Sequence, residues 1–207
     1  MDAGAFIGLH SLFLAKACHC TVYAFEPQPT VFGLLSQNIA QNKLEEVILP
    51  TCVMLSNESG IAKMAVPKSY NAWTNPGGLG IVDASFSNPD LRVISVPKAT
   101  LDSFSLENVS LMKVDVEGHE MEVLAGAAGL IWSCRPVMVV ELLGGCDRTE
   151  HAPEIARRIK HIEDSFHYTM VETIAHDYVF VPAEKSEFTT PSGCPPGGTP
   201  PTLPVHS

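Results

Sequence analysis

Two apolar runs separated by a helical pattern constrain the fold more than any other feature of this sequence. Residues 109–114 and 137–142 carry mostly apolar side chains at successive positions, which predicts strands that are buried on both faces. Between them, residues 118–128 place their apolar side chains at helical spacing, so a helix is expected there. Buried strands that alternate with helices indicate a mostly parallel sheet covered by helices.

The same alternation continues through most of the chain. We expect further helices at residues 8–18, 30–42 and 154–166, and further strands at residues 20–25, 47–55, 61–66 and 91–96. Residues 168–174 and 178–181 flank a short turn and indicate a closing antiparallel hairpin. Residues 68–90 are rich in Asn, Pro, Gly and Ser and predict a long surface loop, of a kind that often serves as a functional lid. The predicted fold class is therefore α/β, with a mostly parallel sheet that ends in an antiparallel hairpin.

Length and composition fit one globular domain. The chain has 207 residues, of which 45% are hydrophobic, and this is enough to fill a sizeable core. The composition changes near the C-terminus, where Pro and Gly dominate. We predict one domain over residues 1–184 and a flexible Pro/Gly-rich tail over residues 185–207.

The charge of the chain argues against two classes of partner. The formal net charge is -10 at pH 7 and the pI is near 5.2, whereas nucleic acids and anionic membrane surfaces attract basic proteins. No apolar run approaches the ~20 residues of a membrane-spanning helix. The N-terminus also lacks the basic region of a secretory signal. We expect a cytoplasmic protein with no nucleic-acid and no membrane partner, and the sequence leaves its oligomeric state open.

A glycine turn stands at the start of the chain. In the stretch DAGAFIG, Gly4 allows the backbone to approach a ligand and Gly8 allows the following helix to pack closely. The spacing is GxxxG, and Asp2 precedes the first glycine. An acid at this position disfavours the pyrophosphate of a dinucleotide and tolerates a cationic or zwitterionic ligand.

A second acid follows the next predicted strand. Glu26 ends the run VYAFE, and a carboxylate at this place can accept hydrogen bonds from both hydroxyls of a ribose. Glu26 could equally be a solvated turn residue before Pro27. The combination of a glycine turn with an acid one strand later favours nucleoside binding.

A cluster of charged residues follows the buried strand at residues 109–114. In KVDVEGHE, Asp115 and Glu117 lie between a strand and a helix, which places them at the ligand-facing edge of a parallel sheet. Glu141 ends the next buried strand at the same edge and is a candidate for substrate binding. Lys113 is expected to pair with Asp115 or Glu141, and Glu120 is expected to be a solvated residue of the first helical turn.

Five segments, in order, resemble the FkbM family of S-adenosylmethionine-dependent methyltransferases: DAGAFIG, VYAFEPQP, LDSF, LMKVDVEGHEMEVLAGA and PVMVVEL. The resemblance extends from residue 2 to about residue 182. It implies a Rossmann-like class I methyltransferase sheet of seven strands and O-methylation of a hydroxyl on a sugar or small molecule. It further implies that S-adenosyl-L-methionine is the cofactor and that these residues bind it: Asp2, Gly4 and Gly8 at the methionine end, Glu26 at the ribose, Phe25 and Pro27 beside the adenosine, and Ser56 and Asn57 near the adenine.

Methyl transfer from a sulfonium to a hydroxyl needs in-line alignment and removal of one proton. A general base contributes roughly 10²–10⁴-fold to such a step. Asp115, Glu117 and His119 are the candidate catalytic residues, because a cluster of acids raises the pKa of one member and because an imidazole titrates near neutrality.

A metal site was considered and is not predicted. Oxygen ligands from Asp115, Glu117 and Glu141 would suit Mg²⁺, but nothing in the sequence requires it. The six cysteines include no CxxC pair, and the segment 18–20 (CHC) has no second pair of ligands for zinc.

The chain departs from the family pattern at its start. The strand that would lead into Asp2 is largely missing, and that strand would be central in the sheet. Two alternatives therefore stay open. A nicotinamide-dependent oxidoreductase shares the glycine turn and the ribose acid, although no Tyr has a Lys four residues after it. A non-catalytic remnant that binds a nucleoside is the other.

Overall fold

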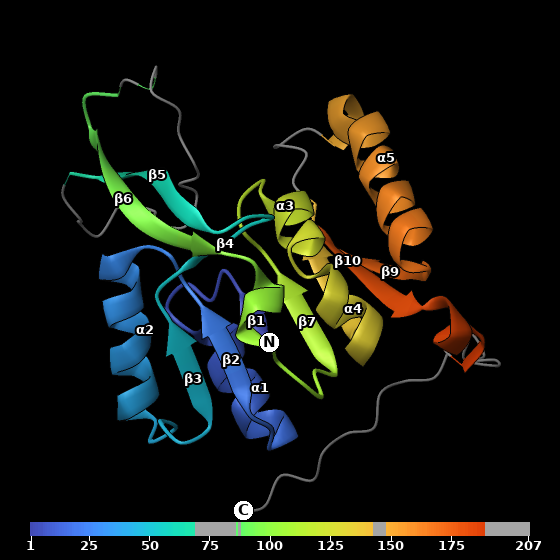
Figure 1. The fold of residues 1–207 in the computed structure, drawn as a ribbon, viewed down its shortest axis with the longest axis horizontal. Helices are drawn as coiled ribbons and strands as arrows, with labels where there is room; N and C mark the ends of the chain where they lie inside the picture. The colour runs from blue at the N-terminus through green and yellow to red at the C-terminus, as the bar shows by residue number, and fades with distance from the viewer. Residues whose placement is uncertain (69–85, 87, 143–147, 189–207) are drawn as a thin grey trace, which may run out of the picture.

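The computed structural model describes residues 1–68, 86, 88–142 and 148–188. Most of the predicted loop at residues 68–90, and the predicted tail from residue 189 onward, lie outside the described residues. Figure 1 shows a seven-stranded sheet through the centre of the molecule and a smaller three-stranded sheet beside one end of it.

The large sheet confirms the predicted fold class. Its strands follow the order β3-β2-β1-β7-β8-β10-β9, in which the first five are mutually parallel and β10 is antiparallel to both of its neighbours. From one edge to the other the strands are β3 (Ile48–Thr51), β2 (Val22–Phe25), β1 (Asp2–Ala3), β7 (Leu111–Val114), β8 (Val137–Glu141), β10 (Asp177–Pro182) and β9 (Tyr168–Ile174).

The central strand β1 is only two residues long. Asp2 pairs with Ala24 of β2 and with Lys113 of β7, so the sheet is continuous at this level. Both partners lie in the carboxyl halves of their strands, and Asp2 and Ala3 are fully buried. The short strand thus joins the two halves of the sheet at the edge that faces the ligand in folds of this class.

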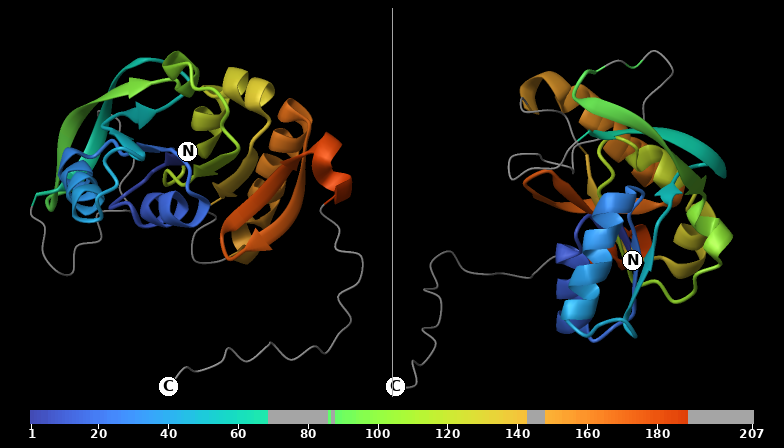
Figure 2. Two further views of the ribbon diagram at one scale, coloured as in Figure 1. Left: turned by 90° about the horizontal axis from the view of Figure 1, so that it is seen from below. Right: turned by 90° about the vertical axis from the view of Figure 1, so that its left-hand side faces the viewer.

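The strand order reverses direction at β1 and β7, which places helices on both faces of the sheet (Figures 1 and 2). The alternation of side chains along β2 separates two cores. Val22 and Ala24 pack in a cluster with buried residues of α1 (Leu9–Cys18) and α2 (Pro29–Gln41). Phe25 belongs instead to the cluster formed with α3 (Glu120–Ala125), α4 (Ala128–Cys134) and α5 (Arg148–Phe166).

The small sheet corrects one predicted strand. Residues 47–55 were expected to form a single strand, but they form β3 in the large sheet and β4 (Met54–Leu55) in the small one. A tight turn separates the two, since the Val53 amide donates to the Thr51 carbonyl at 3.1 Å. The other members of the small sheet are β5 (Gly60–Pro67) and β6 (Leu91–Ala99), which pair antiparallel. The short 3₁₀ helix η1 (Leu101–Phe104) follows β6.

Two predicted helices also have different bounds. The helix expected at residues 118–128 ends at Ala125, and a second helix, α4, follows it. The chain bends at Gly126, where an added Cβ would lie 2.0 Å from the Ser56 carbonyl oxygen, so this glycine allows close contact between the bend and the segment after β4. Helix α5 begins six residues before its predicted start and contains Pro153.

Arg135 ties the C-terminal part of the domain to the sheet. Its guanidinium lies over the rings of Trp132 and Tyr168, 5.1 and 4.6 Å from the ring centroids. It also donates two hydrogen bonds to Glu184 in the 3₁₀ helix η2 (Ala183–Phe188), at 2.9 Å each. We refer to this arrangement of Trp132, Arg135, Tyr168 and Glu184 as the arginine clasp.

Within the residues that the structure describes, no helix is both long enough and apolar enough to cross a membrane. The cytoplasmic location stays a prediction.

Candidate functional site

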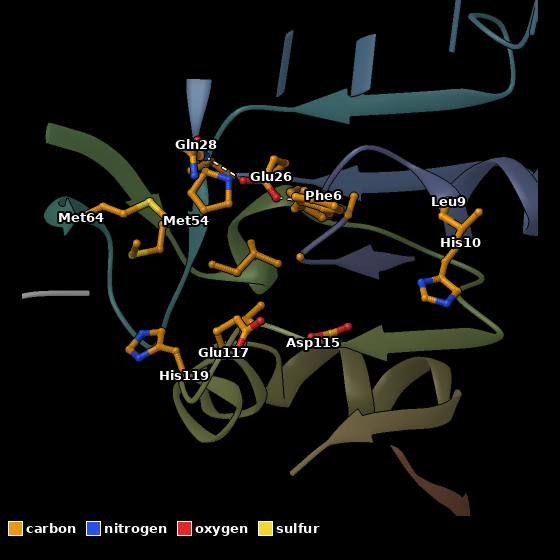
Figure 3. Close-up of a pocket in the computed structure, with 17 residues that line it drawn as sticks. Phe6, Leu9, His10, Glu26, Gln28, Met54, Met64, Asp115, Glu117 and His119 are labelled. Carbon is orange, nitrogen blue, oxygen red and sulfur yellow. Dashed lines mark hydrogen bonds between the residues drawn. The ribbon is translucent and has the colours of Figure 1, made fainter. Parts of the chain in front are cut away.

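A cavity of about 240 Å³ lies where β1, β2 and β7 end, at the carboxyl edge of the large sheet (Figure 3). The small sheet contributes one wall of the cavity through Met54, Leu55 and Met64. The residues that line it are Gly4, Ala5, Phe6, Leu9, His10, Phe25, Glu26, Pro27, Gln28, Val53, Met54, Leu55, Met64, Asp115, Val116, Glu117 and His119.

The glycine turn forms part of this lining and is held against two strands. The amides of Gly4 and Ala5 both donate to the Phe25 carbonyl, at 3.0 and 2.9 Å. Gly4 has φ +80°, and a Cβ at this position would lie 1.7 Å from the Asp115 carbonyl oxygen. The close approach that Gly4 allows is therefore first of all between the backbones after β1 and β7.

Two other predicted residues of this turn are buried outside the cavity lining. Gly8 packs against α2, because an added Cβ would lie 2.7 Å from Leu35 Cδ1. Asp2 is fully buried, and its Oδ2 accepts a hydrogen bond from Ser11 Oγ at 2.6 Å. Within the described residues its Oδ1 has no hydrogen-bond partner. Both residues thus fix the position of α1 relative to β1, and their contact with a cofactor stays a prediction.

Glu26 lines the cavity and is held by the backbone. Its Oε2 accepts from the Phe6 amide at 3.0 Å and its Oε1 from the Gln28 amide at 2.9 Å. Only 7% of the residue is exposed. Burial raises the pKa of Glu26 to about 7, an effect that the two amides partly offset and that the charge of Asp2 reinforces. Each carboxylate oxygen keeps a further lone pair, so the group can still accept two hydroxyl donors.

Asp115 belongs to a charged group at the opposite side of the cavity, which Figure 3 shows across from Glu26. Lys113 Nζ donates to Asp115 Oδ2 at 2.5 Å, which confirms the predicted pairing. The carboxyl groups of Asp115 and Glu141 also share a hydrogen bond. Burial, the hydrogen bond with Asp115 and the charge of Asp115 raise the pKa of Glu141 to about 8. Burial acts to raise the pKa of Asp115 as well, but the hydrogen bonds from Glu141 and Lys113 outweigh it and lower that pKa.

These opposite shifts define the protonation of the pair. At neutral pH, Glu141 carries the proton and donates it in a hydrogen bond to the Asp115 carboxylate. Glu141 is not among the residues that line the cavity, and its carboxyl group interacts with Asp115, which does line it. Its direct contact with a substrate stays a prediction.

Glu117 and His119 lie on the loop between β7 and α3, and both line the cavity. Glu117 is exposed and has φ +55°, and burial together with the charges of Asp115 and Glu120 raises its pKa. His119 is half-buried. Burial lowers its pKa, and the charge of Lys98 acts in the same direction, whereas that of Glu122 opposes them.

The neighbours of His119 favour one tautomer. Nδ1 lies 3.3 Å from Glu122 Oε2, an atom that only accepts hydrogen bonds while the carboxylate is ionised. The proton of a neutral imidazole is therefore favoured on Nδ1, which leaves Nε2 as an acceptor. Ser56 Oγ lies 3.1 Å from Nε2 and can donate to it, or to Asn57 Oδ1 at 3.3 Å.

The expected adenine-side residues divide between the lining and its surroundings. Phe25 and Pro27 line the cavity, whereas Ser56 is buried behind it and Asn57 is exposed beside Ser56. In their place, Val53, Met54 and Leu55 of the same segment reach the cavity. The roles predicted for all these residues remain predictions.

Sequence reasoning missed several residues of the site and misjudged one. The amide of Phe6 anchors Glu26, and its place inside the glycine turn was the available signal. Met54 and Met64 come from a second sheet that no local pattern predicted. Glu120, expected to be solvated, is fully buried, because α5 covers it and brings Arg158 Nη1 to 3.6 Å from Glu120 Oε2.

In the part of the chain that the structure describes, no group of three or more His, Cys, Asp or Glu side chains has an arrangement that could hold a metal ion.

The fold and the site together define a class. A mostly parallel sheet with helices on both faces, a glycine turn after β1, an acid after β2 and a cavity at the carboxyl edge are the features of a doubly wound α/β domain. The model of the FkbM methyltransferase domain matches residues 2–181, and the chain belongs to this family.

Individual relatives agree with this assignment. The chain is 31% identical over 168 residues to methyltransferase sdnD of Sordaria araneosa, a match that covers 68% of this chain and 64% of that protein. It is 33% identical over 153 residues to the hexuronic acid methyltransferase AglP of Haloferax volcanii, covering 70% of this chain and 56% of that protein. The chain therefore spans less than two thirds of the length of these relatives.

A solved structure shows the same fold. The crystal structure of methyltransferase FkbM from Methylobacillus flagellatus superposes with a TM-score of 0.56 at 14% identity, and the match covers 86% of this chain and 41% of that one.

Proposed function

We propose that this chain is the catalytic domain of an S-adenosylmethionine-dependent methyltransferase that methylates a hydroxyl oxygen of a sugar or small molecule. The observation that carries the proposal is the charge of the cavity. Among the described residues that line it, three are acids (Glu26, Asp115 and Glu117) and none is Lys or Arg. Such a lining attracts a sulfonium cation and repels the pyrophosphate of a dinucleotide, which disfavours the oxidoreductase alternative.

The residues present fit the cofactor. Glu26 is fixed by two backbone amides and retains acceptor capacity for the two ribose hydroxyls. Phe25, Pro27 and the methionines of the small sheet provide an apolar surface for the base. When bound, S-adenosylmethionine would supply an electrophilic methyl group.

The acceptor hydroxyl must be held in line with that methyl group and must lose a proton. Asp115, Glu117 and His119 lie together on one side of the cavity and are the groups proposed to do this. Glu117 and the Nε2 atom of His119 are the better bases at neutral pH, since Lys113 and Glu141 hold the pKa of Asp115 low. Asp115 is suited to accept a hydrogen bond from the acceptor, with Glu141 as its support.

The chemical class of the acceptor is supported by the relatives. One of them is named for methylation of a hexuronic acid, which is a sugar. The acceptor would enter beside Glu117, the most exposed acid of the lining.

Calorimetric titration with S-adenosylhomocysteine tests the proposal, with NAD as the competing ligand. Micromolar binding of S-adenosylhomocysteine and no binding of NAD is the expected result. Binding of NAD in preference would overturn the proposal in favour of an oxidoreductase. A folded chain that binds neither ligand would overturn it in favour of a non-catalytic domain.

A further inference from the structure

The loop at residues 115–119 carries four of the residues that line the cavity, and one buried carboxylate holds this loop from behind. We infer that Glu120 is a positioning residue, whose carboxylate fixes the loop conformation that presents Glu117 and His119 to the cavity. The ligand named in the test below comes from the proposed function, on which that part of the inference rests. The anchoring of the loop by Glu120 rests on the geometry alone.

The contacts of Glu120 point back toward the loop. Glu120 is the first residue of α3 and is fully buried. Its Oε1 accepts a hydrogen bond from the Gly118 amide at 2.7 Å, and burial raises the pKa of the carboxyl group, an effect that backbone amides partly offset. This hydrogen bond runs from the first residue of the helix back to the loop and fixes the path of the chain between β7 and α3.

The loop needs such an anchor because its backbone is in an unfavourable region. Glu117 has φ +55° and Gly118 has φ +96°, so two successive residues are left-handed. A non-glycine residue in this region costs on the order of 1 kcal/mol and persists only where the surrounding structure holds it. The Gly118 amide that Glu120 accepts from lies directly after Glu117.

Arg158 balances the charge of Glu120 without replacing this contact. Its Nη1 lies 3.6 Å from Glu120 Oε2, and within the described part of the chain neither atom has a hydrogen bond. Arg158 Nε is instead bonded to Glu154 Oε1 at 2.9 Å on the same helix. The hydrogen bonds of Glu120 therefore serve the loop, whereas α5 supplies the counter-charge that a buried carboxylate requires.

Two variants disturb the same loop from different directions. Glu120→Met keeps the approximate length of the side chain and removes the oxygen that accepts from the Gly118 amide. Gly118→Ala leaves Glu120 intact and strains the backbone, since a Cβ on Gly118 meets no atom within 4 Å and only its φ opposes the change. Glu154→Gln is the matched control, because it also alters a partner of Arg158 and touches no residue of the loop.

Two measurements on these variants test the inference. Hydrogen exchange of the amides at residues 116–120 is followed without ligand, and the Kd for S-adenosylhomocysteine is measured at a temperature where every variant is folded. We expect faster exchange and roughly tenfold weaker binding in Glu120→Met and in Gly118→Ala, and wild-type values in Glu154→Gln. The double variant should bind no more weakly than the weaker single variant, because both act through one loop.

The outcomes separate the inference from the proposed function. Wild-type exchange and wild-type Kd in Glu120→Met would overturn the inference. It would also be overturned if the fold-losses of affinity in the two single variants multiplied in the double variant. A lowered thermal stability with unchanged exchange and Kd would show a purely structural role. If the wild-type chain does not bind S-adenosylhomocysteine, the proposed function fails, and the exchange of the loop amides still decides whether Glu120 anchors it.

Discussion

Two acid-bearing segments face each other across the cavity, and they are built differently. Glu26 follows β2, and among the described residues its carboxylate is held by main-chain donors, the amides of Phe6 and Gln28. Asp115 follows β7 and is held by side chains, namely Lys113 and Glu141. Both segments follow strands that flank β1 in the same sheet. The segment after β2 presents an acid that is fixed by the backbone, whereas the segment after β7 presents a network of charged side chains.

The difference separates binding from proton transfer. A carboxylate held by backbone amides keeps one geometry whatever the state of its neighbours, which suits recognition of a constant ligand group. A set of coupled carboxyl groups moves protons easily, because the pKa of each depends on the charge of the others. The structure therefore predicts that loss of Glu26 after β2 affects cofactor affinity and that loss of the Asp115 or His119 side chain after β7 affects the methyl-transfer step. Displacement of the loop backbone after β7 is a different case, because that backbone also carries Val116 of the cavity lining.

The largest effect is expected from removal of the fixed acid. Glu26→Ala should weaken binding of S-adenosylhomocysteine by roughly 100-fold, because the ribose hydroxyls lose their acceptor and the Phe6 and Gln28 amides lose their partner. Calorimetry measures the effect, with the exposed Glu46→Ala as control. An affinity within threefold of wild type would show that Glu26 does not bind the cofactor.

Binding should also depend on pH through the same group. Hydroxyl donors favour the ionised carboxylate, and the ionised fraction of Glu26 falls as the pH drops below its pKa of about 7. The affinity for S-adenosylhomocysteine should therefore decrease up to about tenfold per pH unit below pH 7 and level off above pH 8. Glu26→Gln should remove this dependence. A pH profile that is flat in the wild type contradicts the assignment.

Substitutions on the other side should affect turnover. Asp115→Asn and His119→Ala should each lower the rate of methyl transfer by at least about tenfold and change the affinity for S-adenosylhomocysteine by less than threefold. Transfer of a radiolabelled methyl group to a panel of sugars and small hydroxyl compounds provides the rate. Equal losses of cofactor affinity in these variants would remove the distinction between the two segments.

The smallest effect concerns the charge of the ligand. Sinefungin carries an ammonium group where the sulfonium methyl lies, so the acids after β7 should make it bind several-fold more tightly than neutral S-adenosylhomocysteine. Glu117→Gln should reduce this preference without changing the affinity for S-adenosylhomocysteine. A preference that persists in Glu117→Gln, or that is absent from the wild type, would place the methyl group away from this segment.

Local patterns predicted the large sheet because its strands and helices are set by short-range periodicity. Alternation of apolar runs with a helical pattern is enough to indicate β7, α3 and β8, whereas the order of the strands became known only from the structure. The position of Glu26 and of Asp115 at the carboxyl edge followed from the same argument.

The remainder depended on contacts between distant segments. Residues 47–55 were predicted to form one strand. The pairing of β4 with β6 in the structure shows that the chain passes from the large sheet to the small sheet within this segment. Glu120 has the sequence context of an exposed first-turn acid, and its burial results from the packing of α5, which begins 28 residues later. The amide of Phe6 could not be assigned to Glu26 before the backbone of the glycine turn was known.

The arginine clasp gives the protein an internal optical probe. The chain contains two tryptophans, and Trp132 is 48% exposed beside the Arg135 guanidinium and 5.5 Å from the ring of His167. In a Trp73→Phe background, emission would come from Trp132 alone and would change when the C-terminal strands detach. Fluorescence could then follow the loosening of this end of the domain separately from ligand binding at the cavity, within a single sample.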